Sequence, residues 1–184
     1  MKVSNILLSI AVVPFSLFAA ELEADKAHSE VHFSVSHMVV SRTKGEFSEF
    51  DSKVVVEDDE LVSVTATIPV SSIDTDNKKR DDHLKSADFF HVEKYPNITF
   101  ESTKVEDGKL VGNLTIMDVT KEIELDLEFL GPVKGPWGKT RYGLNLEGEI
   151  DRTEYGLTWN KTLEAGGLVV GDKVTLNISV ELMK

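Results

Sequence analysis

Apolar and polar residues alternate along most of the chain beyond residue 30. This period of two is typical of β-strands that bury one face and expose the other. The clearest case is residues 123–129, where Ile, Leu, Leu and Phe alternate with acidic residues. The alternation predicts strands near residues 31–39, 62–70, 98–101, 110–116, 123–129, 142–150 and 174–182. A less regular strand over residues 45–56 brings the total to about eight.

Most of the predicted connections are short and rich in Gly and Asp, so we expect neighbouring strands to pair as antiparallel hairpins. The exception is residues 74–96. Within this stretch residues 76–84 do not alternate and begin with residue types that cap helices. They predict a short helical insertion between the third and fourth strands.

Eight strands with one apolar face can form either a sandwich or a closed barrel. Closure removes the sheet edges that invite aggregation, so the prediction is an all-β fold with an extended eight-stranded antiparallel barrel. A barrel of this size lies between one filled by its own side chains and one that holds a ligand. Ala66, Gly112 and Gly148 are small residues at inward positions and favour a cavity.

The N-terminus has the features of a secretory signal peptide. Lys2 precedes an apolar run over residues 6–18, and two alanines follow before Glu21. We therefore expect residues 1–20 to be a cleaved signal peptide and residues 21–184 to form one exported domain. No later segment approaches the roughly 20 apolar residues of a membrane span, so no stable membrane insertion is expected. Without cysteine, stability has to come from burial.

The charge and the reactive residues argue for a binding protein. The chain has 20 basic and 32 acidic residues, a net charge of −12 that disfavours nucleic acid and anionic membrane surfaces as partners. The five histidines show no metal-ligand spacing, and no nucleophile or phosphate-loop motif occurs. We expect no metal, cofactor or catalytic residue.

One dense ionisable cluster, Arg80-Asp81-Asp82-His83, leaves an alternative open. Such a group could support acid–base chemistry in a small hydrolase or metal-dependent enzyme. It could equally serve structural pairing and helix capping. A third interpretation is a stress protein whose barrel is fully packed and holds no ligand.

Ordered sequence elements across residues 22–184 resemble the YceI-like polyisoprenoid-binding family. They are DKAHS at 25–29, VHF at 31–33, RDDHLKSADFF at 80–90, KYP at 94–96, TFEST at 99–103, VTK at 119–121 and Arg152 with YGL at 155–157. Asp118 departs from the family's usual Gly, which a turn tolerates because Asp can adopt left-handed backbone geometry. Leu22 stands where the family commonly has an aromatic residue.

The resemblance implies a lipocalin-like barrel, exported to the periplasm, that carries a polyisoprenoid or other long-chain lipid such as an isoprenoid quinone or its precursor. Dimers are known in this family, so a homodimer is a candidate assembly. With the alternation, it predicts a lumen lined by Phe33, Val35, Ile68, Phe89, Phe90, Phe100, Leu114, Ile116, Leu125, Leu127, Leu144 and Leu146. Phe89 and Phe90 are expected near a lid, and Arg80 and His83 at the mouth beside a polar head group.

Overall fold

A computed structural model describes residues 19–136, 138–164 and 166–184. The predicted signal peptide lies almost entirely outside them. Its last two residues, Ala19 and Ala20, lie in the first strand, where they pair with Glu57 and Val56.

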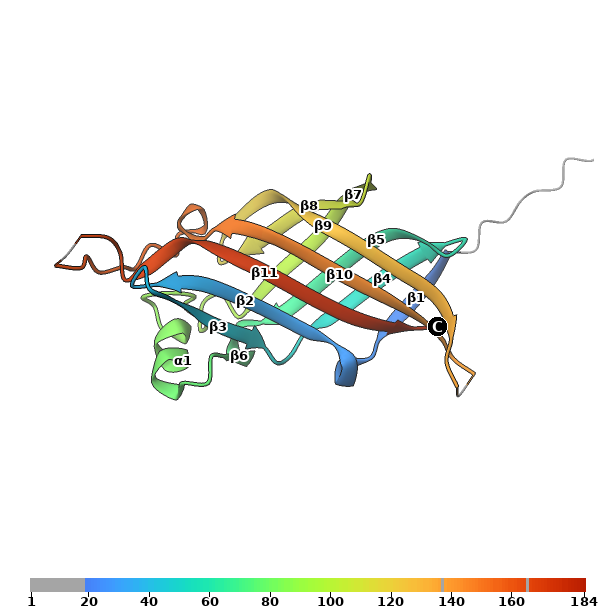
Figure 1. The fold of residues 1–184 in the computed structure, drawn as a ribbon, viewed down its shortest axis with the longest axis horizontal. Coiled ribbons are helices and arrows are strands. Elements are labelled where there is room, and N and C mark those ends of the chain that lie inside the picture. The colour runs from blue at the N-terminus through green and yellow to red at the C-terminus, as the bar shows by residue number, and fades with distance from the viewer. Residues whose placement is uncertain (1–18, 137, 165) are drawn as a thin grey trace, which may run out of the picture.

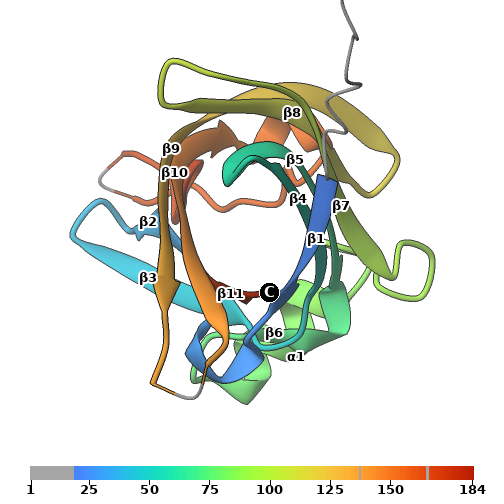
Figure 2. The same cartoon turned by 90° about the vertical axis from the view of Figure 1, so that its right-hand side faces the viewer.

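The described residues form one antiparallel sheet with one short α-helix (Figure 1). The strands are β1 (Ala19–Ala24), β2 (Glu30–His37), β3 (Ser41–Phe47), β4 (Asp51–Glu57), β5 (Glu60–Pro69), β6 (Ile73–Asp74), β7 (Asn97–Glu106), β8 (Lys109–Ile116), β9 (Val119–Lys134), β10 (Thr140–Asp151) and β11 (Val170–Met183). The order β1-β4-β5-β7-β8-β9-β10-β11 closes into a ring of eight because β1 also pairs with β11. Figure 2 shows this ring end-on. The predicted closed barrel is confirmed.

At three neighbouring positions around the barrel, the place of one long strand is taken by two shorter strands that follow one another along the barrel. Towards the end that carries the helix, β2, β3 and β6 replace β1, β4 and β5: β11 pairs with β2, β2 with β3, and β3 with β6. The breaks are the 3-10 turn Lys26–His28, residues 48–50, and the 3-10 turn Val70–Ser72.

These breaks lie side by side. The backbone N–H of Ser48 donates to the carbonyl of Ser72 at 3.1 Å, and Lys26 Nζ lies 2.8 Å from Asp51 Oδ1. We call this line of three breaks the crease.

The predicted helical insertion is α1 (Lys78–Lys85), which follows β6 and precedes β7. It begins because Asn77 caps it, accepting a hydrogen bond from the N–H of Arg80 at 3.2 Å. Among the described residues no ladder joins β6 to β7. The segment from α1 to Pro96 lies between them in sequence, and the Pro96 carbonyl accepts from Val70 N–H at 2.8 Å.

Strand β9 is longer than the sequence suggests. Three glycines give residues 131–138 the composition of a turn, but β9 continues through Gly131 to Lys134 and pairs with Thr140 and Arg141 of β10. A register shift between Arg141 and Gly143 accommodates the extension, as a β-bulge does. The turn is thereby displaced towards the end of the hairpin.

Candidate functional site: an apolar cavity at the helix end of the barrel

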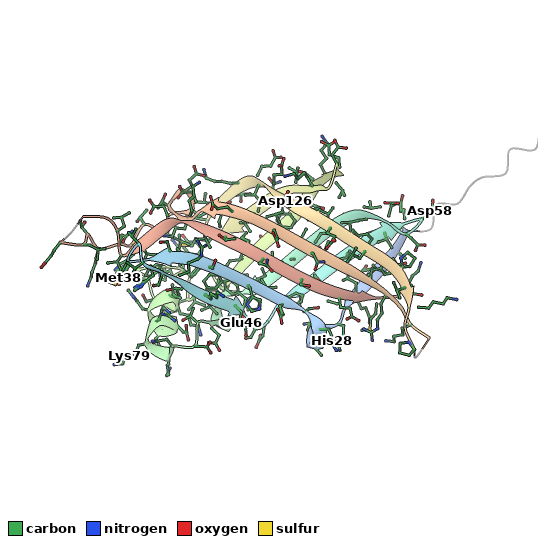
Figure 3. The ribbon with its side chains drawn as sticks, viewed as in Figure 1. His28, Met38, Glu46, Asp58, Lys79 and Asp126 are labelled. Atoms are coloured by element: carbon green, nitrogen blue, oxygen red, sulfur yellow. The ribbon has the colours of Figure 1, made fainter. Side chains whose placement is uncertain are left out.

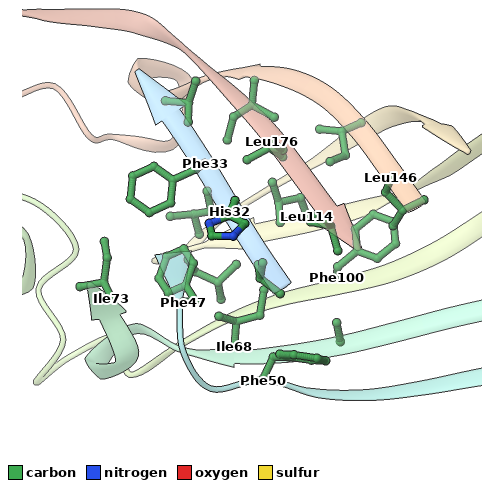
Figure 4. Close-up of a pocket in the computed structure, with 18 of the residues that line it drawn as sticks. His32, Phe33, Phe47, Phe50, Ile68, Ile73, Phe100, Leu114, Leu146 and Leu176 are labelled. Carbon is green, nitrogen blue, oxygen red and sulfur yellow. The ribbon is translucent and has the colours of Figure 1, made fainter. Parts of the chain in front are cut away.

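The barrel encloses a cavity of about 190 Å³, and the atom-free space reaches about 1400 Å³ when the part open to solvent is included. Figure 4 shows part of its wall, with Phe33, Phe100 and Leu146 among the labelled side chains. The complete wall combines side chains of many strands with residues of the insertion. The apolar lining residues are Val31, Phe33, Val35, Phe47, Phe50, Val64, Ala66, Ile68, Ile73, Leu84, Phe89, Phe90, Ile98, Phe100, Leu114, Ile116, Ile123, Leu125, Leu144, Leu146, Ile150, Leu157, Val170, Val174, Leu176, Ile178 and Val180. Apolar cavities of about 150 Å³ already bind small hydrocarbons, so this space can hold an apolar guest.

All of the predicted lumen residues except Leu127 lie on this wall. Leu127 also packs against the core, but it sits one inward position beyond Leu125 on β9, next to the stacked rings of Phe129 and Tyr142. Its register partner on β10, Leu146, does line the cavity. That the lining residues contact a lipid stays a prediction.

Two of the three small residues thought to open the lumen have a different role. Ala66 lines the cavity. A side chain at Gly112 would lie 2.4 Å from the ring of Phe100, and one at Gly148 would lie 2.5 Å from a methyl group of Leu125. The space that these glycines leave is therefore filled by Phe100 and Leu125 and adds no free volume of its own.

The insertion supplies the cavity wall where β6 and β7 are not paired. Leu84, at the end of α1, and Phe89 and Phe90, just after it, line the cavity. The loop is held in place by backbone bonds, including Phe90 N–H to the carbonyl of Leu84 at 3.0 Å. Phe89 and Phe90 therefore belong to the wall, and their place near a lid stays a prediction.

Arg80 and His83 are not among the cavity-lining residues, and their place at the mouth beside a head group stays a prediction. Arg80 is tied back to Thr75, since its Nε donates to Thr75 Oγ1 at 2.7 Å and its Nη2 to the Thr75 carbonyl at 2.6 Å. The His83 ring lies behind Phe89, 5.0 Å between ring centres, and also packs edge-on against Trp159.

The same contacts bear on the alternative of a catalytic cluster. Asp81 Oδ1 accepts from the backbone N–H of Thr75 at 3.0 Å and from its hydroxyl at 2.5 Å, so Asp81 and Arg80 both bind Thr75. His83 Nε2 instead lies 3.0 Å from Asp88. Asp82 Oδ1 lies 3.1 Å from Lys78 Nζ, so all four members of the cluster are engaged in local pairing. Arg80 and Asp81 meet at Thr75 and His83 at Asp88, so the side chains do not converge on one common point.

Three polar residues at the wall were not predicted: His32, Ser52 and Arg152. The His32 ring nitrogens lie 3.0 Å from Glu30 and 3.7 Å from Glu46, whose side chains are exposed, so the ring is directed outwards. The Ser52 hydroxyl is buried without a hydrogen-bond partner in the described part of the chain. The wall therefore offers a guest very few polar contacts.

Arg152 is 4% exposed, yet its guanidinium has many partners. It donates to the carbonyls of Gly171 (2.8 Å), Trp159 (3.1 Å), Val170 (3.3 Å) and Leu157, and its Nη2 lies 3.4 Å from Asp172. Burial lowers the pKa of this guanidinium below its usual value. Because its donors are already taken, Arg152 acts as a brace between the end of β10 and the start of β11.

Comparison with known proteins agrees with this geometry. Residues 22–182 match the YceI-like domain. The chain belongs to the YceI-like family. A UPF0312 protein of Staphylococcus aureus strain bovine RF122 / ET3-1 is 42% identical over 160 residues, which are 85% of this chain and 94% of that protein.

Solved structures include other YceI-like barrels. The YceI protein of Campylobacter jejuni is 36% identical, with a TM-score of 0.70 and coverage of 87% of this chain and 95% of its own. A polyisoprenoid binding domain from Saccharophagus degradans, described as implicated in plant cell wall breakdown, shares the fold at 16% identity and a TM-score of 0.60. That match covers 91% of this chain and 99% of that domain.

One group in this YceI-like barrel has metal-like spacing, although no metal site was expected. Asp25, His28 and Glu181 bring one ligand atom each within 4.8 Å of the others. Arg141 already lies between the carboxylates, 2.9 Å from Asp25 and in contact with Glu181. Its hydrogen bond, followed by that of His28, lowers the pKa of Asp25. The guanidinium supplies the positive charge that these carboxylates need.

The described helices of this YceI-like chain include none with the length and apolar character that crossing a membrane requires.

Proposed function

We propose that this YceI-like protein binds a long-chain apolar lipid of the polyisoprenoid class in its cavity and carries or sequesters it. The observation that supports this most directly is the wall itself, formed by aliphatic and aromatic side chains from the barrel and from the insertion. The polyisoprenoid binding domain from Saccharophagus degradans has the same fold, which is consistent with such a guest. An isoprenoid quinone or its precursor belongs to the same chemical class.

Burial of the chain would provide the binding energy. Each methylene transferred from water to an apolar site contributes about 0.8 kcal/mol, and the ordering of the chain offsets part of that gain. The enclosed 190 Å³ holds only the first part of a long guest. The rest of the guest would extend through the connected space towards the helix end.

Two competing functions receive less support. An enzyme built on Arg80, Asp81 and His83 would need groups that converge, whereas these bind Thr75 and Asp88. A stress protein with a packed interior would have no cavity of this size. We therefore favour a binding protein without catalytic activity.

Location and assembly complete the proposal. An exported, periplasmic carrier agrees with the signal-like N-terminus, and the acidic chain is unsuited to nucleic acid. A homodimer is the candidate assembly, and light scattering of the purified protein measures it.

The test is organic extraction of the purified protein followed by mass spectrometry, with Ile116→Glu as the variant. Ile116 is 4% exposed and lies on the cavity wall. A carboxylate there would lie among apolar groups without a hydrogen-bond partner. Its desolvation would weaken the binding of a hydrocarbon and lower the stability of the wall. We expect a stoichiometric long-chain lipid in the wild type and none in the variant, with export unchanged.

Ile116→Leu is the matched control, because it keeps the volume and the apolar character of the wall. It should retain the lipid. Leu125→Glu repeats the test from β9 in case the first variant folds poorly. A folded Glu variant with undiminished lipid would contradict the placement of the site, and a wild type without lipid would contradict the function.

A further inference from the structure

The tip of the β2–β3 hairpin exposes three consecutive apolar side chains. Val39 is 74% exposed, Val40 86% and Met38 43%. Leu168, in the segment between β10 and β11, is also exposed and lies close by, since Met38 N–H donates to the Val169 carbonyl at 2.8 Å. We call Met38, Val39, Val40 and Leu168 the apolar tip. Most of the large apolar side chains that are exposed in the described residues gather here.

The backbone of the tip is unusual for its residues. Met38 and Val39 have φ angles of 52° and 62°, in the left-handed region. Asn and Gly are the residues that normally occupy such hairpin turns, and a β-branched residue there is strained. The chain thus keeps valine at a position where it lowers stability and gains nothing by burial.

The apolar tip continues the cavity wall. His37, the residue before Met38, pairs with Val170 of β11, and Val170 lines the cavity. Figure 3 shows Met38 at one end of the barrel and Asp58 at the other. The segment that carries Leu168 is held at its base by Arg152 and by Asn160, whose Nδ2 donates to the Val170 carbonyl at 2.6 Å. The tip is therefore fixed at the cavity end.

The charge around the apolar tip is opposite to that of the whole chain. The two flanking segments, residues 37–44 and 158–169, contain Arg42, Lys44 and Lys161 against Glu164, a net charge of 3 − 1 = +2. The complete chain carries −12. Exposed apolar side chains between segments of net positive charge are a combination that favours the surface of an anionic bilayer.

From this juxtaposition we propose that the apolar tip docks on an anionic lipid bilayer and brings the cavity end to the membrane surface. The contact is peripheral: Val39, Val40, Met38 and Leu168 enter the head-group region while the barrel stays outside. The biological role of this docking rests on the proposed function, because a lipid guest has to be exchanged with a membrane. Its measurement does not depend on what the cavity holds.

The test is co-sedimentation with vesicles of phosphatidylethanolamine and phosphatidylglycerol, comparing the wild-type chain with Val39→Asn/Val40→Ser. Both chains keep the same N-terminus, so any difference reports on the tip. We expect the double variant to lose about tenfold in vesicle partitioning, since two side chains no longer bury apolar surface. Its stability should be equal to or higher than that of the wild type, because Asn tolerates the left-handed conformation.

Val133→Ser is the control, because Val133 is an exposed valine (63%) on β9, towards the end of the barrel where β9 and β10 connect. It should bind vesicles like the wild type. Equal binding of the double variant and the wild type, or an equal loss in Val133→Ser, overturns the proposal. So does a concentration-dependent dimer that disappears in the double variant, since the tip would then contact a second copy of the chain.

Lipid extraction separates this inference from the proposed function. A double variant that has lost vesicle binding but still retains its purified lipid supports docking by the tip. A wild type that binds vesicles but never contains lipid would sustain the docking and contradict the carrier function.

Discussion

The strands at both ends of the barrel alternate apolar inward residues with polar outward residues, but the interiors of the two ends differ. Near β1 and the end of β11, inward side chains fill the space, and Leu22, Val54, Leu110 and Leu182 are at most 1% exposed. Near α1, inward residues such as Leu176 on β11 are only partly buried, although they lie inside the ring, because they face the cavity. We call these the packed half and the hollow half.

The difference arises from how each half closes. In the packed half β1 bonds to both β4 and β11, and the rings of Phe129 and Tyr142 stack at 5.8 Å across neighbouring strands. In the hollow half the place between β6 and β7 is covered by the insertion, which adds Leu84, Phe89 and Phe90 to the wall without filling the centre. The apolar inward side chains therefore determine which face of the sheet forms the interior. How the ring of strands is closed determines whether side chains fill that interior.

The strongest test of this contrast uses two leucines of β11. Leu182→Ala removes a fully buried side chain from the packed half and should cost about 3 kcal/mol of unfolding free energy. Leu176→Ala removes a cavity-lining side chain that has fewer neighbours to lose, and should cost about 1 kcal/mol. Urea denaturation of the lipid-free proteins measures both. Equal losses would show that the hollow half is packed in solution.

A second variant fills the hollow half. Ala66 lines the cavity and pairs with Ser52 and Phe100 on the adjacent strands. Ala66→Leu should place its side chain in the free volume and displace the guest, while stability changes by less than about 1.5 kcal/mol because little has to move. Extraction and mass spectrometry report the lipid, and Ala66→Ser serves as a control of small volume. Full lipid retention in Ala66→Leu would argue that the guest lies elsewhere.

The smallest expected effect concerns pH and the packed half. The Tyr142 hydroxyl donates to Asp59 Oδ1 at 2.5 Å, and burial, followed by this carboxylate, raises its pKa to about 12. The unfolded chain loses this proton near pH 10. The folded protein keeps it, so the stabilisation is complete below pH 10 and is lost between about pH 10 and 12.

Tyr142→Phe should therefore cost about 1 kcal/mol at pH 8, through the lost hydrogen bond. The difference from the wild type should shrink at pH 11. Tyr155, whose pKa is also raised to about 12 by burial, leaves some alkaline sensitivity in both proteins. Urea denaturation at the two pH values provides the comparison, and a difference that does not change with pH would speak against a raised Tyr142 pKa.

The strand pattern and the insertion could be predicted from the sequence because each has a local signal. Alternation identifies inward positions, and Asn77 before a run without alternation marks the start of α1. Alternation carries no information about where a cavity ends, so Leu127 could not be distinguished from Leu125. The roles of Gly112 and Gly148 were also hidden, because the side chains that cover them come from other strands.

The partners of the charged residues could not be identified from the sequence. Arg80 and His83 lie close together in sequence and suggested a mouth, whereas the structure pairs them with Thr75, Asp88 and Trp159. Arg152 was recognised only as part of a family motif. No sequence pattern indicates that its guanidinium is buried among the carbonyls of another loop.

The crease has a mechanical consequence. Three adjacent strand positions are interrupted along one line, where Ser48 bonds to Ser72 and Lys26 pairs with Asp51 instead of forming a continuous ladder. Bending along such a seam strains only a few isolated hydrogen bonds and ion pairs. The strand pairs on either side of it keep their register. We therefore expect the barrel to widen by bending along this seam when a guest enters or leaves. The packed half should keep its structure during this motion.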